Sequence, residues 1–251
     1  MGEMEKQFYL REMKLCKSEI PGKSYLCRLP VIQHLKELSF QSPVTFFVGE
    51  NGTGKSTLLE AIAVACGFNP EGGSRNFTFS TAQTHSELWE YIRLVRGTRR
   101  PRDGFFLRAE SFYNVASNID ELDEQPSGAA AIIDSYGGIS LHEQSHGESF
   151  FALVMNRFRG HGLYLLDEPE AALSPARQMA LLARIHELVS EDSQFLIATH
   201  SPILTAYPGA EIYELSDGGV QLTPYQKTEN YQITRRFLLN TEGMLKELLE
   251  E

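Results

Sequence analysis

The sequence has little cysteine, no long apolar run and a deficit of positive charge. Its three cysteines, Cys16, Cys27 and Cys66, form no CxxC pair, so we expect no disulfide-stabilised secreted scaffold and favour a reduced, cytoplasmic setting. No stretch approaches the roughly 18 apolar residues of a membrane span. Residues 1–14 carry acids where a secretion signal has a basic start and an apolar core. We therefore expect no direct membrane insertion.

The charge balance of the chain is acidic. Lysine and arginine total 23 and aspartate and glutamate total 33 among 251 residues, a net charge of −10. An acidic surface is poorly suited to non-specific binding of nucleic acid or anionic lipid. The sequence also has no internal repeat and no sustained heptad, so we expect no long coiled-coil arm.

Apolar runs alternate with helix-like segments along most of the chain. The runs at 44–48, 163–166 and 195–198 are typical of strands covered on both faces of a sheet. Helices are expected at 55–66, 84–96, 111–123, 148–158, 175–191 and beyond 230. This alternation predicts an α/β fold with a doubly wound, mostly parallel sheet. We expect a single domain, 1–251, with a small helical lobe over about 67–140 and a C-terminal hairpin and helix over about 210–251.

The segment GENGTGKST matches the phosphate-binding pattern G-x-x-x-x-G-K-[ST] between an apolar run and a helical segment. Its glycines let backbone N–H groups turn inward to hold phosphate, and the following helix N-terminus adds partial positive charge. We expect Lys55 to reach the β- and γ-phosphates and Ser56 to bind Mg²⁺. The predicted phosphate-binding residues are Gly49, Glu50, Asn51, Gly52, Thr53, Gly54, Lys55, Ser56 and Thr57.

An acidic motif, Asp167-Glu168, directly follows the apolar run 163–166, and Asp167 lies 112 residues after Lys55. A buried strand that ends in such a pair is typical of P-loop NTPases, in which the aspartate binds Mg²⁺ beside the phosphates. Glu168 stands one residue further, where a carboxylate can activate the attacking water as a general base. We therefore predict Asp167 as a magnesium ligand and Glu168 as a catalytic residue.

Two further segments resemble motifs of ABC-class ATPases. The segment QSHGE resembles the LSGGQ signature and keeps Ser145 and Gly147, although its other three positions differ. The resemblance implies that these two residues contact the γ-phosphate bound by an opposite subunit. Ser145 with Glu148 also matches an ordinary helix capping box. His200, at the end of the apolar run 195–198, resembles the family's switch histidine, which senses the γ-phosphate.

Residues 44–202 as a whole resemble ABC-class ATPases. The segments ENGTGKST, GLYLLDEPEAALSP and ATHSPIL look like the soluble branch of that class, which includes SMC, recombination-repair and OLD-type proteins. The segment FFLRAESFYN is similar to one in stand-alone bacterial "predicted AAA-family ATPase" proteins. The resemblance implies an ATP hydrolase that binds ATP and Mg²⁺ between two copies of the chain, in an ATP-dependent homodimer. ATP rather than GTP rests on the resemblance alone, because the sequence has no base-reading NKxD motif.

Two features of the family pattern have no single match. The family's Mg²⁺-contacting glutamine corresponds either to Gln83, in a predicted loop, or to Glu110, a carboxylate that follows the strand-like segment 105–107. Tyr9 and Tyr25 are candidates for stacking on adenine, and either residue also suits the core.

The stretch from Arg93 to Arg108 holds six arginines and one acid, Asp103. Guanidinium groups suit phosphate recognition, so this cluster is a candidate site for a protein partner or nucleic acid. Pairing with the surplus carboxylates is the other interpretation. The alternative overall function is the ATP-binding subunit of an ABC transporter, against which the altered signature and the missing glutamine argue.

Overall fold

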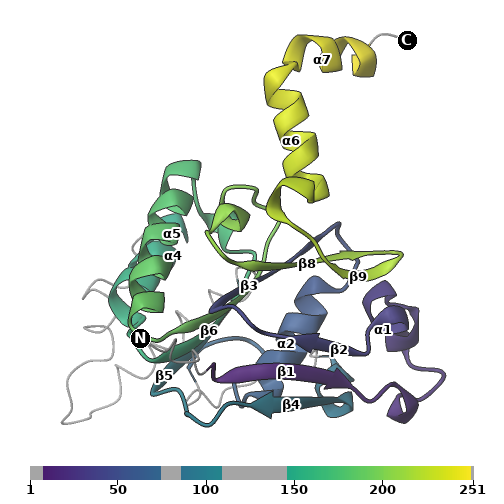
Figure 1. Ribbon diagram of the computed structural model, residues 1–251, viewed down its shortest axis with the longest axis vertical. Helices are drawn as coiled ribbons and strands as arrows, with labels where there is room; N and C mark the ends of the chain where they lie inside the picture. The colour runs from purple at the N-terminus through teal and green to yellow at the C-terminus, as the bar shows by residue number, and fades with distance from the viewer. Residues whose placement is uncertain (1–7, 75–85, 109–145, 250–251) are drawn as a thin grey trace, which may run out of the picture.

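A computed structural model describes residues 8–74, 86–108 and 146–249. Its main sheet has the strand order β5-β6-β7-β3-β8-β9 (Figure 1). The strands are β5 (Asp103–Arg108), β6 (Gly162–Asp167), β7 (Gln194–Ala198), β3 (Val44–Gly49), β8 (Glu211–Ser216) and β9 (Gly219–Leu222). All neighbours in this sheet are parallel except β8 and β9. The mostly parallel α/β fold predicted from the sequence is confirmed.

A smaller antiparallel sheet has the order β2-β1-β4. Its strands are β1 (Leu10–Leu15), β2 (Glu37–Ser39) and β4 (Ile92–Arg96). The helices are α1 (Pro30–His34), α2 (Lys55–Ala65), α4 (His146–Arg157), α5 (Pro175–Ser190), α6 (Glu229–Leu239) and α7 (Thr241–Leu249).

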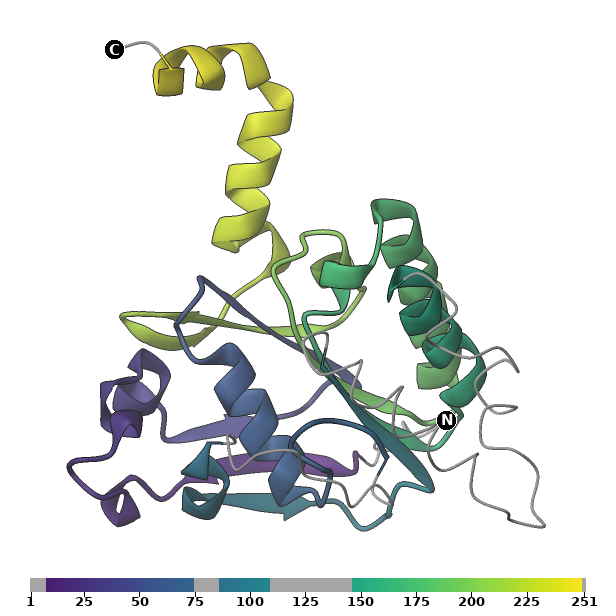
Figure 2. The ribbon, with the colours of Figure 1, turned by 180° about the vertical axis from the view of Figure 1, so that it is seen from behind.

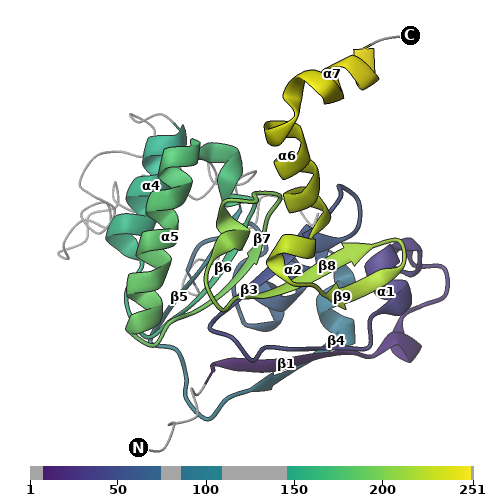
Figure 3. The same cartoon turned by 45° about the horizontal axis from the view of Figure 1, so that its top comes forward.

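The main sheet is covered on both faces (Figures 2 and 3). Alternate residues of β3 show the division, because Phe47 packs with the core around α2, α1 and the smaller sheet, whereas Phe46 packs with the core around α4 and α5. Every residue of β6 and β7 is buried. Burial on both faces explains why these strands are continuously apolar in the sequence rather than alternating.

The prediction of a helix at 84–96 is wrong for residues 86–96, the part of this range that the structure describes. A short 3-10 helix covers Glu87–Tyr91, and β4 follows it at once. Leu88 and Ile92 are both buried, so their spacing of four mimics a helical face. Pairing of β4 with the distant β1 decides the conformation instead.

The small lobe expected over 67–140 stays a prediction, because much of that range lies outside the described residues. Strand β4 belongs to the smaller sheet, and β5 forms one edge of the main sheet. The expected helix at 111–123 lies outside the described residues. The hairpin expected after residue 210 is present as β8 and β9.

The chain ends in two helices, α6 and α7, that extend away from the sheets (Figures 1 and 3). Neither helix has a buried residue. Several of their apolar side chains are more than half exposed: Ile233, Leu238, Leu239, Leu248 and Leu249. No helix among the described residues is long and apolar enough to cross a membrane.

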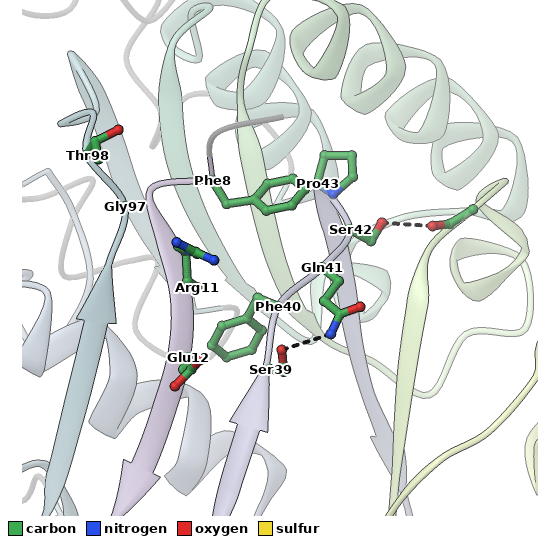
Figure 4. A pocket seen from close by; sticks show the side chains of 11 residues that line it. Phe8, Arg11, Glu12, Ser39, Phe40, Gln41, Ser42, Pro43, Gly97 and Thr98 are labelled. Atoms are coloured by element: carbon green, nitrogen blue, oxygen red, sulfur yellow. Dashed lines mark hydrogen bonds between the residues drawn. The ribbon is translucent and has the colours of Figure 1, made fainter. Parts of the chain in front are cut away.

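A hollow of 680 Å³ opens beside Arg11, Phe40 and Pro43 (Figure 4). Pro43 precedes the first residue of β3, whereas the phosphate-binding pattern begins at the last residue of that strand, Gly49. The hollow therefore lies at the opposite end of β3 from the predicted nucleotide site and is a separate feature of the surface.

Candidate functional site

The predicted phosphate-binding loop joins the end of β3 to the start of α2, as the sequence pattern requires. Gly49, Gly52 and Gly54 have φ angles of +139°, +83° and +100°, a region that glycine adopts without steric cost. A Cβ at Gly49 would lie 2.1 Å from the carbonyl oxygen of Leu215. The loop conformation therefore requires glycine at its first position for space as well as for backbone angle.

Lys55 begins α2 and folds back over the loop. Its Nζ donates hydrogen bonds to the carbonyl oxygens of Gly49 and Glu50, each at 2.8 Å, and the residue is only 4% exposed. Burial lowers the pKa of the ammonium, while the negative charges of Glu168 and Asp167 raise it in part. The cation is thus held inside the loop by neutral acceptors that an anionic ligand can replace.

Asp167 and Glu168 lie where β6 ends. Asp167 is 6% exposed, and Glu168 has a left-handed φ of +51° and ψ of 50°. The backbone N–H of Glu168 donates to the carbonyl oxygen of Ala198 at 2.9 Å, which fixes this unfavourable conformation. Strain of this kind costs about 1 kcal/mol or more and is common at functional sites.

His200 follows β7 and faces Glu168, with 3.7 Å between Nε2 and Oε1. The carboxylate of Glu170 holds this segment in place. It accepts a hydrogen bond from the Thr199 hydroxyl at 2.7 Å and a short one from the His200 backbone N–H. Glu170 stands in the sequence three residues after Asp167, and only its position just past a strand end could have indicated a role.

A second residue that sequence reasoning missed is Asn230, at the start of α6. Its side-chain amide donates to the carbonyl oxygen of His200 at 3.0 Å. Asn230 and His200 line a hollow of 360 Å³ together with Glu50 and Asn51 of the phosphate-binding loop. The structure therefore brings the loop, the histidine and the base of the C-terminal helices to one place.

The signature-like segment is described only from α4 onward, and Ser145 lies outside the described residues. A Cβ at Gly147 would lie 2.3 Å from the carbonyl oxygen of Ala172 and 3.0 Å from a guanidinium nitrogen of Arg177. Glycine at this position therefore lets the start of α4 approach the segment after β6 within the same chain. This packing requirement exists whether or not the residue also contacts a nucleotide on another subunit.

The remaining sequence candidates separate in the structure. Gln83 and Glu110 lie outside the described residues. Tyr9 is buried, and its hydroxyl donates to the carbonyl oxygen of Asp192 at 2.8 Å, just before β7 begins. It therefore lies at the wrong end of the sheet to stack on a nucleotide held by the loop. Tyr25 is 50% exposed, so the expectation of a core residue is wrong there, and adenine stacking by Tyr25 stays a prediction.

The arginines between Arg93 and Arg108 do not form one patch. Arg93 pairs with Glu19 at 3.0 Å, Arg96 donates to the carbonyl oxygen of Ala65, and Arg99 lies 3.4 Å from a carboxylate oxygen of Asp192. Arg108 lies at the far end of β5 with its side chain 20% exposed. Pairing with acids therefore accounts for several members of the cluster, and nucleic-acid binding stays a prediction for the exposed ones.

Replacing Glu170 with glutamine is expected to loosen the His200 segment. The variant puts an amide where a carboxylate accepts two hydrogen bonds, so the free energy of unfolding should fall by roughly 1.5–3 kcal/mol. Thermal unfolding should then show a midpoint about 3–10 °C lower. Glu187→Gln, on the exposed face of α5, is the matched control and should leave the midpoint unchanged. A Glu170→Gln midpoint equal to that of the parent protein would contradict the holding role.

Comparisons with known proteins cover most of the chain. A family model described as "AAA domain" matches residues 24–126, and one described as "AAA domain, putative AbiEii toxin, Type IV TA system" matches residues 99–206. The cobalt import ATP-binding protein CbiO of Salmonella typhimurium is 26% identical over 199 residues, which cover 75% of this chain and 70% of that protein.

The ribose import ATP-binding protein RbsA of Yersinia pestis is also 26% identical, over 198 residues and 71% of this chain, but the chain spans only 36% of its length. Among solved structures, cbiO1 from Clostridium perfringens, part of the ABC transporter complex cbiONQ, has a TM-score of 0.50 and 16% identity. That match covers 98% of this chain and 100% of the other. Two overlapping segments of the chain are therefore similar to AAA domains, and the fold is similar to that of an ABC transporter ATP-binding protein.

Proposed function

We propose that the chain binds and hydrolyses MgATP. The observation that supports this proposal is the convergence of Lys55, Asp167, Glu168 and His200 at the carboxyl edge of one parallel sheet, with Glu168 and His200 only 3.7 Å apart. Ligands of open α/β sheets bind at this edge. The ATP-binding relatives and the AAA-domain matches support the same activity.

The oxygen donors of the site fit Mg²⁺. Ser56 offers a hydroxyl in the first turn of α2, and Asp167 offers a carboxylate at the end of β6. Mg²⁺ is usually held by one or two carboxylates together with phosphate oxygens and water, not by a cage of protein ligands. The described residues contain no group of three His, Cys, Asp or Glu side chains that could form such a cage. Bound Mg²⁺ would neutralise phosphate charge.

Glu168 is the proposed general base. Its carboxylate takes a proton from the water that attacks the γ-phosphorus, the bond from that phosphorus to the β–γ bridging oxygen breaks, and ADP and phosphate leave. Lys55 stabilises the negative charge on the phosphates. In this proposal His200 hydrogen-bonds the γ-phosphate, and its Nε2 lies 3.7 Å from Oε1 of Glu168, the proposed base.

The proposed active form is an ATP-dependent homodimer in which Ser145 and Gly147 of one copy complete the site of the other. The exposed apolar side chains of α6 and α7 favour a second copy of the chain as the partner. A second copy can cover the exposed leucines of these helices when ATP brings two copies together, and short helices gain stability from packing an apolar face. Asn230 ties the base of α6 to His200, so this surface adjoins the candidate site.

The charges of the two helices are self-complementary as well. Arg235 and Arg236 lie on α6, whereas Glu242 and Glu247 lie on α7. Within one chain, Arg236 and Glu247 already approach to 3.5 Å. A two-fold arrangement can repeat such pairs between copies, because each copy presents the same patch.

Ser145→Arg is expected to block turnover while nucleotide binding is retained, because a long cation at the signature position prevents closure of two copies. Steady-state turnover and equilibrium binding of a fluorescent ATP analogue measure the two effects. Ser190→Arg, at the exposed end of α5, adds the same bulk elsewhere and should not change turnover. Normal turnover by Ser145→Arg would refute completion of the site by a second copy.

A second candidate function is the ATP-binding subunit of an ABC transporter. The names of the relatives from Salmonella typhimurium and Yersinia pestis favour it. Turnover that appears only when a membrane subunit is added would support this alternative. Turnover by the purified chain alone supports the stand-alone ATPase. In that case, the exposed residues Arg99, Arg100 and Arg102 are the proposed contact for a protein partner or nucleic acid.

A further inference from the structure

Arg108 is an arginine placed directly against the predicted magnesium ligand. It ends β5, and the β5–β6 ladder sets it opposite Asp167. Its Nε lies 3.6 Å from Oδ2 of Asp167, and the two side chains are only 20% and 7% exposed. A guanidinium stays protonated at any relevant pH, so a fixed positive charge adjoins this carboxylate before any nucleotide is bound.

The same guanidinium contacts a second buried carboxylate. Its Nη1 donates to Oε2 of Glu60, whose side chain is 8% exposed and lies on α2, the helix that begins with Lys55. The other oxygen of Glu60 accepts a hydrogen bond from the backbone N–H of Ser86 at 2.8 Å. Arg108 therefore joins the helix of the phosphate-binding loop to the strand that presents Asp167.

Charge balance gives this arrangement a consequence for metal binding. Buried carboxylates are costly unless a cation accompanies them. Arg108 supplies that cation in the nucleotide-free protein, so a divalent ion that binds Asp167 gains less than it would from an uncompensated carboxylate. Glu60 acts in the opposite direction, because it draws part of the guanidinium's interaction away from Asp167.

We propose that Arg108 is a positioning residue that lowers the affinity of the nucleotide site for its divalent cation. Glu60 partly offsets this effect, because it also interacts with the Arg108 guanidinium. The proposal rests on the proposed function, because it takes Asp167 as the ligand of Mg²⁺.

The test is a titration of Mg²⁺ at fixed concentrations of the full-length chain and a fluorescent ATP analogue, with nucleotide binding as the readout. Arg108→Gln should lower the Mg²⁺ concentration for half-maximal nucleotide binding by about tenfold. A tenfold change corresponds to only a part of the Coulomb interaction between two charges at this distance. Glu60→Gln should raise that concentration, because Arg108 then loses its contact with the Glu60 carboxylate and interacts more strongly with Asp167. The opposite signs separate this proposal from a merely structural role, in which both variants would weaken binding.

Arg157→Gln is the matched control, since Arg157 also forms a partly buried pair, with Asp103 at 2.9 Å, and that pair lies at the other end of β5. It should destabilise the fold without shifting the Mg²⁺ titration. Arg108→Lys keeps the charge and should stay near the parent value. An unchanged or raised Mg²⁺ requirement in folded Arg108→Gln would overturn the proposal. A separate control tests the proposed function itself. If Asp167→Ala gives the same Mg²⁺ titration as the parent protein, Asp167 is not the magnesium ligand and the proposed function fails at that point.

Discussion

Lys55→Ala is expected to abolish tight binding of MgATP. The parent ammonium exchanges two carbonyl acceptors, those of Gly49 and Glu50, for phosphate oxygens, and each charge-assisted hydrogen bond is worth about 1.5–3 kcal/mol. Loss of two such bonds corresponds to a fall in affinity of roughly 10²–10⁴-fold. Isothermal titration or fluorescence with an ATP analogue measures the change.

A measurement of folding stability distinguishes loss of nucleotide binding in Lys55→Ala from loss of folding. Burial lowers the pKa of Lys55 below its ordinary value of 10.5, so the unfolded chain holds its proton more tightly than the folded one. The stability of the parent protein relative to Lys55→Ala should therefore rise as the pH increases toward that ordinary value. Lys14→Ala, at a half-exposed position on β1, is the control and should bind nucleotide normally. Unchanged affinity in folded Lys55→Ala would refute the phosphate-binding role of the loop.

The sequence predicts those elements whose local residue pattern is compatible with only one conformation. Strands β3, β6 and β7 are continuously apolar because both faces of the sheet are covered. The loop after β3 could be recognised because positive φ angles and the close approach of Leu215 leave glycine as the residue that fits. Placement of Asp167 and His200 at one edge then follows from parallel strand order.

Contacts between distant segments could not be predicted in the same way. Nothing local to Arg108 distinguishes it from the exposed arginines before β5, because its partners Glu60 and Asp167 come from other elements. Asn230 gains its role only because α6 begins beside His200. The sequence predicts helix instead of strand at β4 for the same reason, since the conformation of β4 depends on pairing with β1.

Glu168→Gln is expected to bind MgATP and to turn over at least about 10²-fold more slowly, the usual scale for loss of a general base. Glutamine keeps the size of the side chain and tolerates the left-handed backbone no worse than glutamate does. Binding should therefore survive while proton transfer fails. Glu187→Gln serves again as the control, because it removes an exposed carboxylate from α5.

The same variant provides the sharpest test of assembly, because it holds the ATP-bound state long enough to be weighed. Light scattering on a sizing column should show a monomer without nucleotide and a dimer with MgATP. Adding Ser145→Arg to Glu168→Gln should return the mass to that of a monomer. Turnover near the parent value would remove Glu168 from its catalytic role. A monomeric mass with bound MgATP would refute the homodimer while leaving the nucleotide site of the single chain intact.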